Sequence, residues 1–409
     1  MKYVIIGNSA AAAGCVAGVR GIDTESPITV ISDERHGSYS RPLISYWMCG
    51  KVTDENMSYR DSAFFEKNNC SVIEGRKAVK IISVKKAVVL DDNQWIEYDR
   101  LLVATGSLPF VPPISGMETV GKVFTFLNWD SAEDLRNAVD AESKVVIMGA
   151  GLIGLKAAEG LHGMCAGITV VDLADRVLPS ILDTDGAGII QKHIESKGIR
   201  IILNDAADSV SANELKLRSG TILPFDVLVV AVGVRPNTAL AKEAGSTVNK
   251  GIITDDHMRT SLSGVYAAGD CVESYDISTG QSRVLALLPN AYIQGETAGI
   301  NMAGGDASFK NAIPMNSIGF FGLHIISAGS MDGECEVWDT GQSYRKLSFS
   351  DNRLKGYIMI GDVDRAGIYT SLIREQTPLD EVDSDILKSS PQMLIFSKAV
   401  RKQKMAGGA

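Results

Sequence analysis

The fold is decided by the stretch Lys144-Val145-Val146-Ile147-Met148-Gly149-Ala150-Gly151-Leu152-Ile153-Gly154. Its first half is a run of strand-forming apolar residues, and its second half has the spacing G-x-G-x-x-G. A helix-compatible run follows to about Ala166, and a further apolar run, Ile168-Thr169-Val170-Val171, ends at Asp172. Strand, glycine turn, helix and strand in this order predict a βαβ unit that binds a dinucleotide.

Each glycine of this turn has a physical reason. Gly149 permits the tight turn, Gly151 lets the backbone approach a pyrophosphate, and Gly154 lets the helix pack closely on the strand. The N-terminus of the helix adds partial positive charge for the phosphates. Asp172 is placed to accept hydrogen bonds from a ribose 2′-hydroxyl, which favours NADH, while Arg176 keeps NADPH open as the less favoured choice.

A weaker copy of the same unit begins the chain. Its parts are the strand Val4-Ile5-Ile6, the turn Gly7-Asn8-Ser9-Ala10-Ala11-Ala12, a helical run to Arg20, and the strand Ile28-Thr29-Val30-Ile31, which ends at Ser32-Asp33. Gly7 occupies the tight turn, and the small residues Ser9 and Ala12 stand where the second and third glycines belong. Asp33 lies where a ribose-binding acid is expected. Serine in place of glycine weakens the match, so an ordinary βα turn is an equal alternative on these residues alone.

Two such units in one chain indicate two dinucleotides held together. The economical reason is an electron relay, in which one dinucleotide is a diffusible hydride donor and the other is a bound flavin.

Length and charge set further bounds. The 409 residues are enough for two or three domains. The formal net charge of −9 and the lack of a long basic run argue against a nucleic-acid partner. No apolar run reaches the roughly 18 to 20 residues of a membrane span, and the short apolar run at the N-terminus leads straight into a glycine turn. We therefore expect a cytoplasmic protein with no membrane partner.

Four further segments carry a family resemblance. They are Tyr98-Asp99-Arg100-Leu101-Leu102-Val103-Ala104-Thr105-Gly106-Ser107, Phe225 to Asn237 with Val232-Gly233 after its apolar run, Thr260 to Asp270 with Gly269-Asp270 at its end, and Asn290 to Gly304. Together with the two fingerprints, and in this order from residue 4 to about residue 305, they resemble the FAD- and NAD(P)-dependent pyridine nucleotide-disulfide oxidoreductase superfamily.

The resemblance implies the architecture and the role of each site. We expect an α/β chain with two Rossmann-like dinucleotide-binding domains, the NAD domain being inserted in the FAD domain, and a small α+β C-terminal domain. The expected ranges are 1–112 and 241–310 for FAD, 113–240 for NAD(P), and 311–409 for the C-terminal domain. The implied FAD residues are Gly7, Ser9, Ala12, Asp33, Ala104, Thr105, Gly106, Gly269 and Asp270, and the implied NAD residues are Gly149, Gly151, Gly154, Asp172, Val232 and Gly233.

Within the superfamily, the likeness is greatest to NADH:rubredoxin reductases and to the N-terminal flavoprotein part of NADH-dependent nitrite reductases. The run Tyr39-Ser40-Arg41-Pro42-Leu43-Ile44-Ser45 looks like their flavin-side loop, which adds Arg41 and Pro42 to the implied FAD residues. The C-terminal region contains two strand-like runs, Arg345 to Ser350 and Leu354 to Gly361. The intervening Asp351-Asn352-Arg353 predicts a hairpin turn.

The cysteines depart from the disulfide-reducing members of the superfamily. None of Cys15, Cys49, Cys70, Cys165, Cys271 and Cys335 forms a Cys-x-x-Cys or Cys-x4-Cys pair. Coenzyme A-disulfide reductases resemble this chain but use a cysteine about where Ser40-Arg41 stand. Cys49 lies eight residues beyond Arg41, so we interpret it as a packed thiol, with a redox role as the less favoured alternative. Without a thiolate relay, reduced flavin would pass its electrons on directly.

A second departure concerns a charge near the flavin. Relatives place a lysine at about Tyr46 that pairs with a glutamate two residues after the last fingerprint glycine, where this chain has Lys156. We hypothesise that Lys156 reaches flavin N5 and stabilises the anionic reduced ring by Coulomb attraction. An exposed helix lysine is the equal alternative.

The resulting hypothesis is an enzyme that passes electrons from NADH through bound FAD to a small redox protein such as rubredoxin or another iron–sulfur carrier. The alternatives are a coenzyme A-disulfide or polysulfide reductase, an NADH oxidase, and a flavoprotein subunit of a larger redox complex. A homodimer is compatible with all of them. The five histidines share no ligand spacing, so we predict no metal site.

Overall fold

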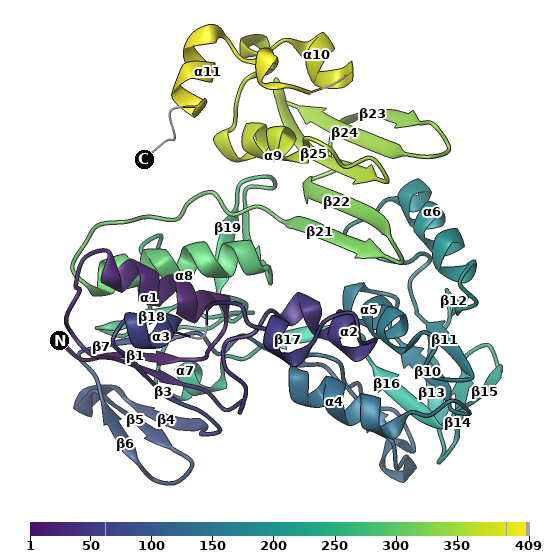
Figure 1. Cartoon of the computed structure of the whole chain (residues 1–409), viewed down its shortest axis with the longest axis horizontal. Helices are drawn as coiled ribbons and strands as arrows, with labels where there is room; N and C mark the ends of the chain where they lie inside the picture. Colours follow the sequence, from purple (N-terminus) through teal and green to yellow (C-terminus); the bar gives the residue numbers. More distant parts are fainter. Residues whose placement is uncertain (62, 390, 406–409) are drawn as a thin grey trace. The chain divides into compact units, whose positions relative to one another are not determined.

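The computed structural model describes residues 1–61, 63–389 and 391–405 and divides into two compact units (Figure 1). Unit 1 consists of Met1–Ser180, Ala187–Ser274 and Arg283–Phe309. Unit 2 consists of Ile181–Gly186, Tyr275–Ser282 and Lys310–Ala409. No helix in the described part of the chain is both long and apolar enough to cross a membrane.

Unit 1 contains two five-stranded sheets. The first has the strand order β18-β7-β1-β2-β3, with β18 Val265–Ala267, β7 Arg100–Val103, β1 Tyr3–Ile6, β2 Ile28–Ile31 and β3 Cys70–Ile73, and every pairing in it is parallel. The second has the order β12-β11-β10-β16-β9, with β12 Arg200–Ile202, β11 Gly167–Val171, β10 Lys144–Met148, β16 Val227–Val230 and β9 Val123–Phe124, also parallel.

The second sheet is an insertion in the first. All of its strands lie between β7 and β18 along the chain, so the chain leaves the first sheet, builds the second, and returns. The antiparallel pair β8 Ser107–Pro109 and β17 Val234–Pro236 joins the outgoing and returning segments. The α/β architecture with one dinucleotide-binding fold inserted in another, predicted from the sequence, is confirmed.

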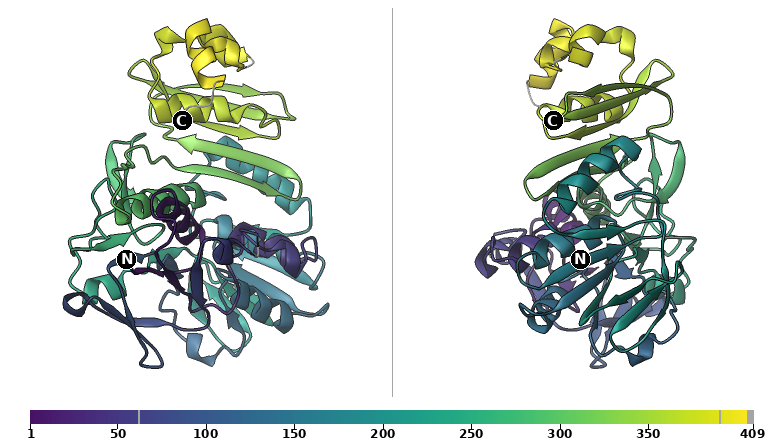
Figure 2. Two further views of the ribbon diagram at one scale, coloured as in Figure 1. Left: turned by 60° about the vertical axis from the view of Figure 1, so that its left-hand side comes forward. Right: turned by 90° about the vertical axis from the view of Figure 1, so that its right-hand side faces the viewer.

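Two glycine-rich helices pack backbone to backbone on the first sheet. They are α1 Ala10–Arg20 and α8 Leu288–Met302, which lie side by side (Figures 1 and 2). A Cβ atom on Gly14 would lie 2.1 Å from the carbonyl oxygen of Tyr292, and one on Gly18 would lie 2.2 Å from that of Glu296. The helices approach so closely because these positions carry no side chain.

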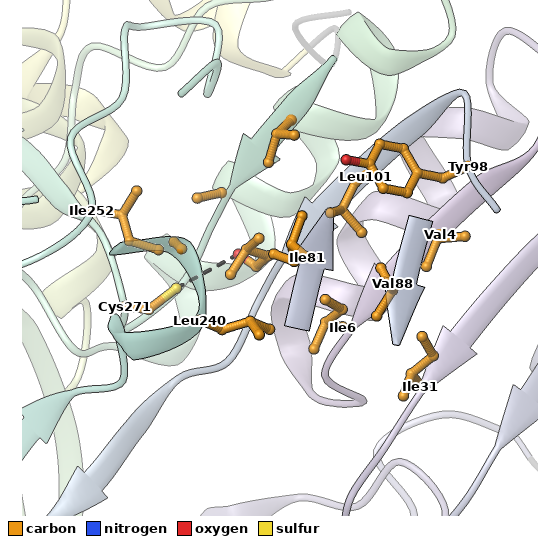
Figure 3. Packing of buried hydrophobic residues seen from close by; sticks show 14 of the residues in the cluster. Val4, Ile6, Ile31, Ile81, Val88, Tyr98, Leu101, Leu240, Ile252 and Cys271 are labelled. Atoms are coloured by element: carbon orange, nitrogen blue, oxygen red, sulfur yellow. Dashed lines mark hydrogen bonds between the residues drawn. The ribbon is translucent and has the colours of Figure 1, made fainter. Parts of the chain in front are cut away.

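The other face of the first sheet is covered by apolar side chains from several elements. Figure 3 shows Val4, Ile6 and Leu101 of the sheet packed with Ile81 and Val88. The last two come from the small antiparallel sheet formed by β4 Ala78–Ile82, β5 Ala87–Leu90 and β6 Trp95–Glu97. A second small antiparallel sheet, β13 Ala207–Val210, β14 Glu214–Leu217 and β15 Ile222–Pro224, packs on the inserted domain.

The helices that follow the two fingerprints begin as predicted, but one ends earlier. α5 spans Leu152–Leu161 rather than continuing to about Ala166. The backbone of His162 is extended and Gly163 has a φ of +83°, so the chain leaves the helix at this point. The helix α4 Trp129–Ala138, which precedes the second fingerprint, is capped by Asn128, whose side chain accepts a hydrogen bond from the Ser131 N–H.

Unit 2 is built on an antiparallel sheet with the order β21-β22-β25-β24-β23. Its strands are β21 Met315–Phe320, β22 Leu323–Gly329, β25 Arg353–Ile360, β24 Tyr344–Ser350 and β23 Glu334–Asp339, and α9 Ala366–Glu375 lies against one face (Figure 2). The predicted hairpin is present as β24–β25. Asp351 and Asn352 at its turn have φ values of +52° and +56°, as a tight two-residue turn requires.

Candidate functional site

The first fingerprint borders a cleft of about 470 Å³, which we call the first cleft. It lies at the carboxyl ends of the first sheet, where ligands bind in open α/β folds. The predicted residues that line it are Gly7, Ser9, Asp33, Arg41, Ala104, Thr105, Gly106, Gly269 and Asp270. Ala12 and Pro42 do not line it: Ala12 is fully buried in α1, and Pro42 lies in the short 3₁₀ helix Arg41–Leu43.

The first cleft has the features that a dinucleotide pyrophosphate needs. A Cβ on Gly7 would lie 2.2 Å from the carbonyl oxygen of Ala104, so only glycine permits this turn. A Cβ on Gly106 would meet no atom within 4 Å, so its backbone faces open space. The buried side-chain oxygen and nitrogen of Asn8, which also lines the cleft, have no hydrogen-bond partner among the described residues. Buried polar atoms need partners, and a bound phosphate fits both this need and the open backbone.

An ion-pair network closes one side of the first cleft. Arg41 pairs with the carboxylate of Glu34 and donates a hydrogen bond of 3.1 Å to the carbonyl oxygen of Leu127. The hydroxyl of Tyr39 donates to Glu34 and accepts from the Trp129 N–H at 3.0 Å. The flavin-side loop is thereby fastened to the segment that leads into α4. Burial works to lower the pKa of Arg41, but Tyr39 and Glu34 outweigh it and raise the pKa.

Asp270 lies at the end of the return strand β18, as predicted. Its burial raises the pKa of the carboxyl, while the nearby Arg41 and a long hydrogen bond of 3.5 Å from the Ser107 hydroxyl lower it in part. The neighbouring Cys271 is buried, and that burial raises the pKa of its thiol to about 11. A thiol that stays protonated is a poor nucleophile.

The second fingerprint borders a larger cleft of about 930 Å³, which we call the second cleft. Both volumes lie within the range of roughly 300 to 1,000 Å³ typical of ligand pockets. The predicted residues that line the second cleft are Gly149, Gly151, Asp172, Val232 and Gly233. Gly154 does not line it, because it packs inside the turn.

The three fingerprint glycines occupy three different environments. A Cβ on Gly149 would lie 2.3 Å from the carbonyl oxygen of Ala231, and one on Gly154 would lie 1.9 Å from that of Gly149. A Cβ on Gly151 would meet nothing within 4 Å, so this backbone is open to the cleft. The carboxylate of Asp172 accepts hydrogen bonds from the N–H groups of Ala150, at 2.5 Å, and Ala174, at 2.8 Å, which fix its orientation beside the turn.

The two clefts meet. Ser107, Leu127 and Asp270 line both of them. The Thr105 hydroxyl donates a hydrogen bond of 2.6 Å to the carbonyl oxygen of Asn237, which holds the outgoing and returning connections together at this point. Two ligands bound in these clefts would therefore approach each other across a short boundary of three residues.

Comparison with known proteins identifies the family. Residues 1–295 match the family described as pyridine nucleotide-disulphide oxidoreductase. The chain belongs to this family. A further match covers residues 314–377, with the description rubredoxin NAD+ reductase C-terminal domain. Membership confirms the predicted oxidoreductase class and the predicted cofactors of the family, FAD and NADH.

Three similar proteins illustrate the range of this oxidoreductase family. The NADH-dependent phenylglyoxylate dehydrogenase subunit epsilon of Aromatoleum evansii is 32% identical, with 94% of each chain covered. The NADH-rubredoxin oxidoreductase of Clostridium acetobutylicum is 26% identical, with 94% of this chain and 97% of that one covered. The structure of a NAD-dependent persulfide reductase from A. fulgidus has a TM-score of 0.84 and 28% identity, covering 93% of this chain and 78% of that one.

Lys156 of this oxidoreductase is held by neighbouring side chains. Its ammonium group pairs with Glu159 one turn further along α5 and lies 4.1 Å from the centre of the Tyr46 ring. Tyr46 belongs to α2 Ile44–Met48, which continues the flavin-side loop. Lys156 lines neither cleft. Its side chain is 12% exposed, so the alternative of an exposed helix lysine is wrong, whereas the predicted role at the flavin remains a prediction.

The cysteines are not among the residues that line the two clefts. All six lie in the described part of the chain, and none of them lines either cleft. Cys49 is half-buried just after α2, with its thiol 3.4 Å from the carbonyl oxygen of Tyr46. This position fits the interpretation of Cys49 as a packed thiol.

Several residues that line the clefts were not among the site residues predicted from the sequence. Asn8, Glu34, Ser107 and Leu127 in the first cleft, and Asp205, Asp208 and Arg218 in the second, come from positions that the fingerprints do not specify. Asn8 could have been found, because it lies inside the first turn. The sequence likewise does not reveal the second partner of His257. Its Nδ1 lies 2.8 Å from the carboxylate of Asp256, and its Nε2 lies 2.9 Å from that of Asp306, which is distant in sequence.

Proposed function

We propose that the first cleft holds FAD, that the second holds NADH, and that the enzyme passes electrons to a small iron–sulfur protein of the rubredoxin type. The observation that carries this proposal is the meeting of two dinucleotide clefts at Ser107, Leu127 and Asp270 with no cysteine lining either one. The match of residues 314–377 to the rubredoxin NAD+ reductase C-terminal domain supports the choice of acceptor.

The residues of the first cleft are suited to binding and orienting FAD. The open backbone at Gly106 and the unpaired amide of Asn8 offer hydrogen bonds to a pyrophosphate. Asp270 offers a half-buried acceptor for hydroxyl groups of the ribityl chain, and the ion pair of Arg41 with Glu34 fastens the flavin-side loop beside the cleft. FAD supplies chemistry that the side chains lack, because it takes up an electron pair from NADH and releases electrons singly.

The second cleft is suited to presenting NADH at the boundary of the first. Gly151 opens the backbone toward a pyrophosphate, and the fixed carboxylate of Asp172 is positioned to accept from a ribose. With FAD and NADH bound, transfer of an electron pair between them would depend on how the clefts place them rather than on a protein acid or base. The role of the chain is therefore to align two ligands and to exclude water between them.

A second candidate function is a flavoprotein subunit of a larger redox complex. It is supported by the Aromatoleum evansii relative, which matches over 94% of each chain and is named as a subunit. In that case the acceptor would be an iron–sulfur centre on a partner chain.

The test is an anaerobic titration of the purified yellow holoprotein with NADH, followed by stopped-flow mixing with oxidised rubredoxin. We expect loss of the flavin absorbance on NADH addition and its recovery as rubredoxin is reduced. A Cys49→Ser variant should behave the same. Rapid bleaching without transfer to rubredoxin would favour the complex subunit, and a failure to bleach would contradict the assignment of the second cleft.

Turnover of a coenzyme A disulfide or of polysulfide that is lost in Cys49→Ser would instead favour the thiol-dependent alternative. Consumption of dioxygen at the same rate as rubredoxin reduction would favour an NADH oxidase.

A further inference from the structure

The second cleft contains a charged wall that the fingerprint does not account for. Besides Asp172, it is lined by Asp205, Asp208 and Arg218. Asp205 follows β12, Asp208 lies in β13, and Arg218 follows β14, so the wall comes from the small antiparallel sheet and the loop leading into it. Because Asp172 marks the ribose of the adenosine half, we call this group the adenosine wall.

Backbone hydrogen bonds attach the adenosine wall to the end of β11. The Asp205 N–H donates to the carbonyl oxygen of Asp172 at 3.1 Å, and the Asn204 N–H donates to that of Ala174 at 2.9 Å. Asp205 therefore lies directly beside the residue that the fingerprint predicts. The two acids are parts of one surface, although they are 33 positions apart in the chain.

Asp205 is held in its charged form. Its carboxylate accepts hydrogen bonds from the N–H groups of Ala206, at 2.9 Å, and Ser219, at 3.2 Å. The Ser219 hydroxyl and these backbone groups hold the pKa of Asp205 below its usual range. Asp208 is exposed and has only a distant ion pair, 3.9 Å from Lys216.

Arg218 is the one cation among the described residues that line the second cleft. Its backbone N–H donates to the carbonyl oxygen of Ala206 at 2.9 Å, which attaches its backbone to the residue that follows Asp205. Arg176, the cation that the sequence offers for NADPH, pairs with Asp175 at 2.8 Å and does not line the cleft. Arg218 is therefore the cation that this lining offers to a 2′-phosphate.

We propose that Asp205 and Asp208 set the preference of this enzyme for NADH over NADPH by adding negative charge beside Asp172 at the adenosine wall. A guanidinium binds a phosphate well when no carboxylate competes for it. With Asp172, three carboxylates and one guanidinium line the cleft, so its wall carries a net negative charge that repels a dianionic 2′-phosphate while a 2′-hydroxyl is accepted. This proposal rests on the proposed assignment of the second cleft to the pyridine nucleotide.

The test measures binding rather than turnover. Dissociation constants of NAD+ and NADP+ are determined by isothermal titration calorimetry on the FAD-loaded full chain and on the variants Asp205→Asn, Asp208→Asn and the double variant. We expect the double variant to bind NADP+ about tenfold or more tightly, because two repulsive charges are removed, and to bind NAD+ within about twofold of the parent protein.

Two further variants make the test specific. Adding Arg218→Ala to the double variant should cancel the gain for NADP+, because the phosphate then has no cation. The control Glu214→Gln removes one negative charge from β14, on a residue that does not line the cleft, and should leave the ratio of the two constants unchanged.

The possible outcomes distinguish an error in the role of the adenosine wall from an error in the assignment of the second cleft. If NAD+ binds every variant but the dissociation constant of NADP+ does not fall in the double variant, the proposed role of the adenosine wall is wrong. It is also wrong if that constant falls equally in Glu214→Gln. If NAD+ does not bind the parent holoprotein, both the cleft assignment and this inference fail. Should Asp205→Asn unfold through loss of its backbone contacts, the exposed Asp208→Asn decides the question alone, with an expected gain of about threefold.

Discussion

The surroundings of Lys156 could not be predicted from the sequence. Its ammonium is paired with Glu159, whose side chain is only 3% exposed, and it lies over the Tyr46 ring. A buried carboxylate that loses its partner is costly, because the charge remains without water around it. The first consequence of removing Lys156 is therefore a loss of stability, whatever its effect on the flavin.

We predict that Lys156→Met lowers the free energy of unfolding by about 3 kcal/mol, as expected for one half of a buried ion pair. The double variant Lys156→Met/Glu159→Leu should recover most of that loss, because no unpaired charge remains. Urea unfolding of the FAD-loaded proteins measures both. Equal losses in the single and double variants would contradict a stabilising role for the pair.

The same two variants test the predicted role at the flavin. If Lys156 stabilises the reduced ring, both variants reduce more slowly with NADH in stopped flow and have a lower flavin potential, although only one of them is unstable. Unchanged flavin reduction in the stable double variant would leave Lys156 as a positioning residue between α5 and α2.

Site residues that the local backbone requires were predictable, and those that only the tertiary fold brings to the site were not. Gly149 and Asp172 are fixed by the turn and by the end of a strand, so their spacing in the sequence identifies them. Asp205 reaches the same surface because the inserted sheet folds back beside β11. No local pattern contains that information.

At the scale of elements, the packing of α1 on α8 holds together two helices that both begin at the first cleft. Both helices contribute glycines at four-residue spacing, Gly14 and Gly18 in α1 and Gly295 and Gly299 in α8. Each would place a Cβ between 2.0 and 2.2 Å from a backbone oxygen of the other helix. Both helices begin at the first cleft, with Ala10 and Leu288 among its lining residues, so this contact fixes how their first turns lie beside each other at the cleft.

We predict that Gly18→Ala destabilises the protein by about 1 to 3 kcal/mol, because the added methyl group meets the backbone of Glu296 and the helices must separate. Alanine is otherwise the better helix former by about 1 kcal/mol. The matched control is Gly188→Ala in α6 Thr184–Glu195, where a Cβ meets nothing within 4 Å. That variant should gain up to about 1 kcal/mol, and the same sign for both changes in thermal or urea unfolding would refute the argument.

Elements whose signal lies within a short stretch of sequence could be predicted. The hairpin β24–β25 was predictable because Asp351 and Asn352 tolerate the positive φ that its turn requires. The pairing of α1 with α8 was not, because nearly 270 residues separate the two helices and a stripe of glycines does not name its partner. The small sheets β4–β6 and β13–β15 were not predicted either, because their short strands carry little periodicity.

At the scale of the whole molecule, the first cleft joins segments that are far apart in the chain. Its lining comes from the first fingerprint, the flavin-side loop, β4, the segment after β7, α7 Ala239–Glu243, the segment after β18, and the start of α8. None of these segments belongs to unit 2. A ligand that contacts all of them links elements of unit 1 that the chain itself connects only through long excursions.

We therefore predict that removal of FAD loosens unit 1 selectively. A ligand present at a thousandfold excess over its dissociation constant stabilises the state that binds it by about 4 kcal/mol. Amide hydrogen exchange in the apoprotein should accelerate in β1, α1 and α8, which border the first cleft, and should change little in β21–β25 of unit 2. Mass spectrometry of the FAD-free and FAD-reconstituted chain measures this difference segment by segment. Equal acceleration in both units would mean that they unfold together, and no acceleration around α1 and α8 would mean that FAD binds elsewhere than in the first cleft.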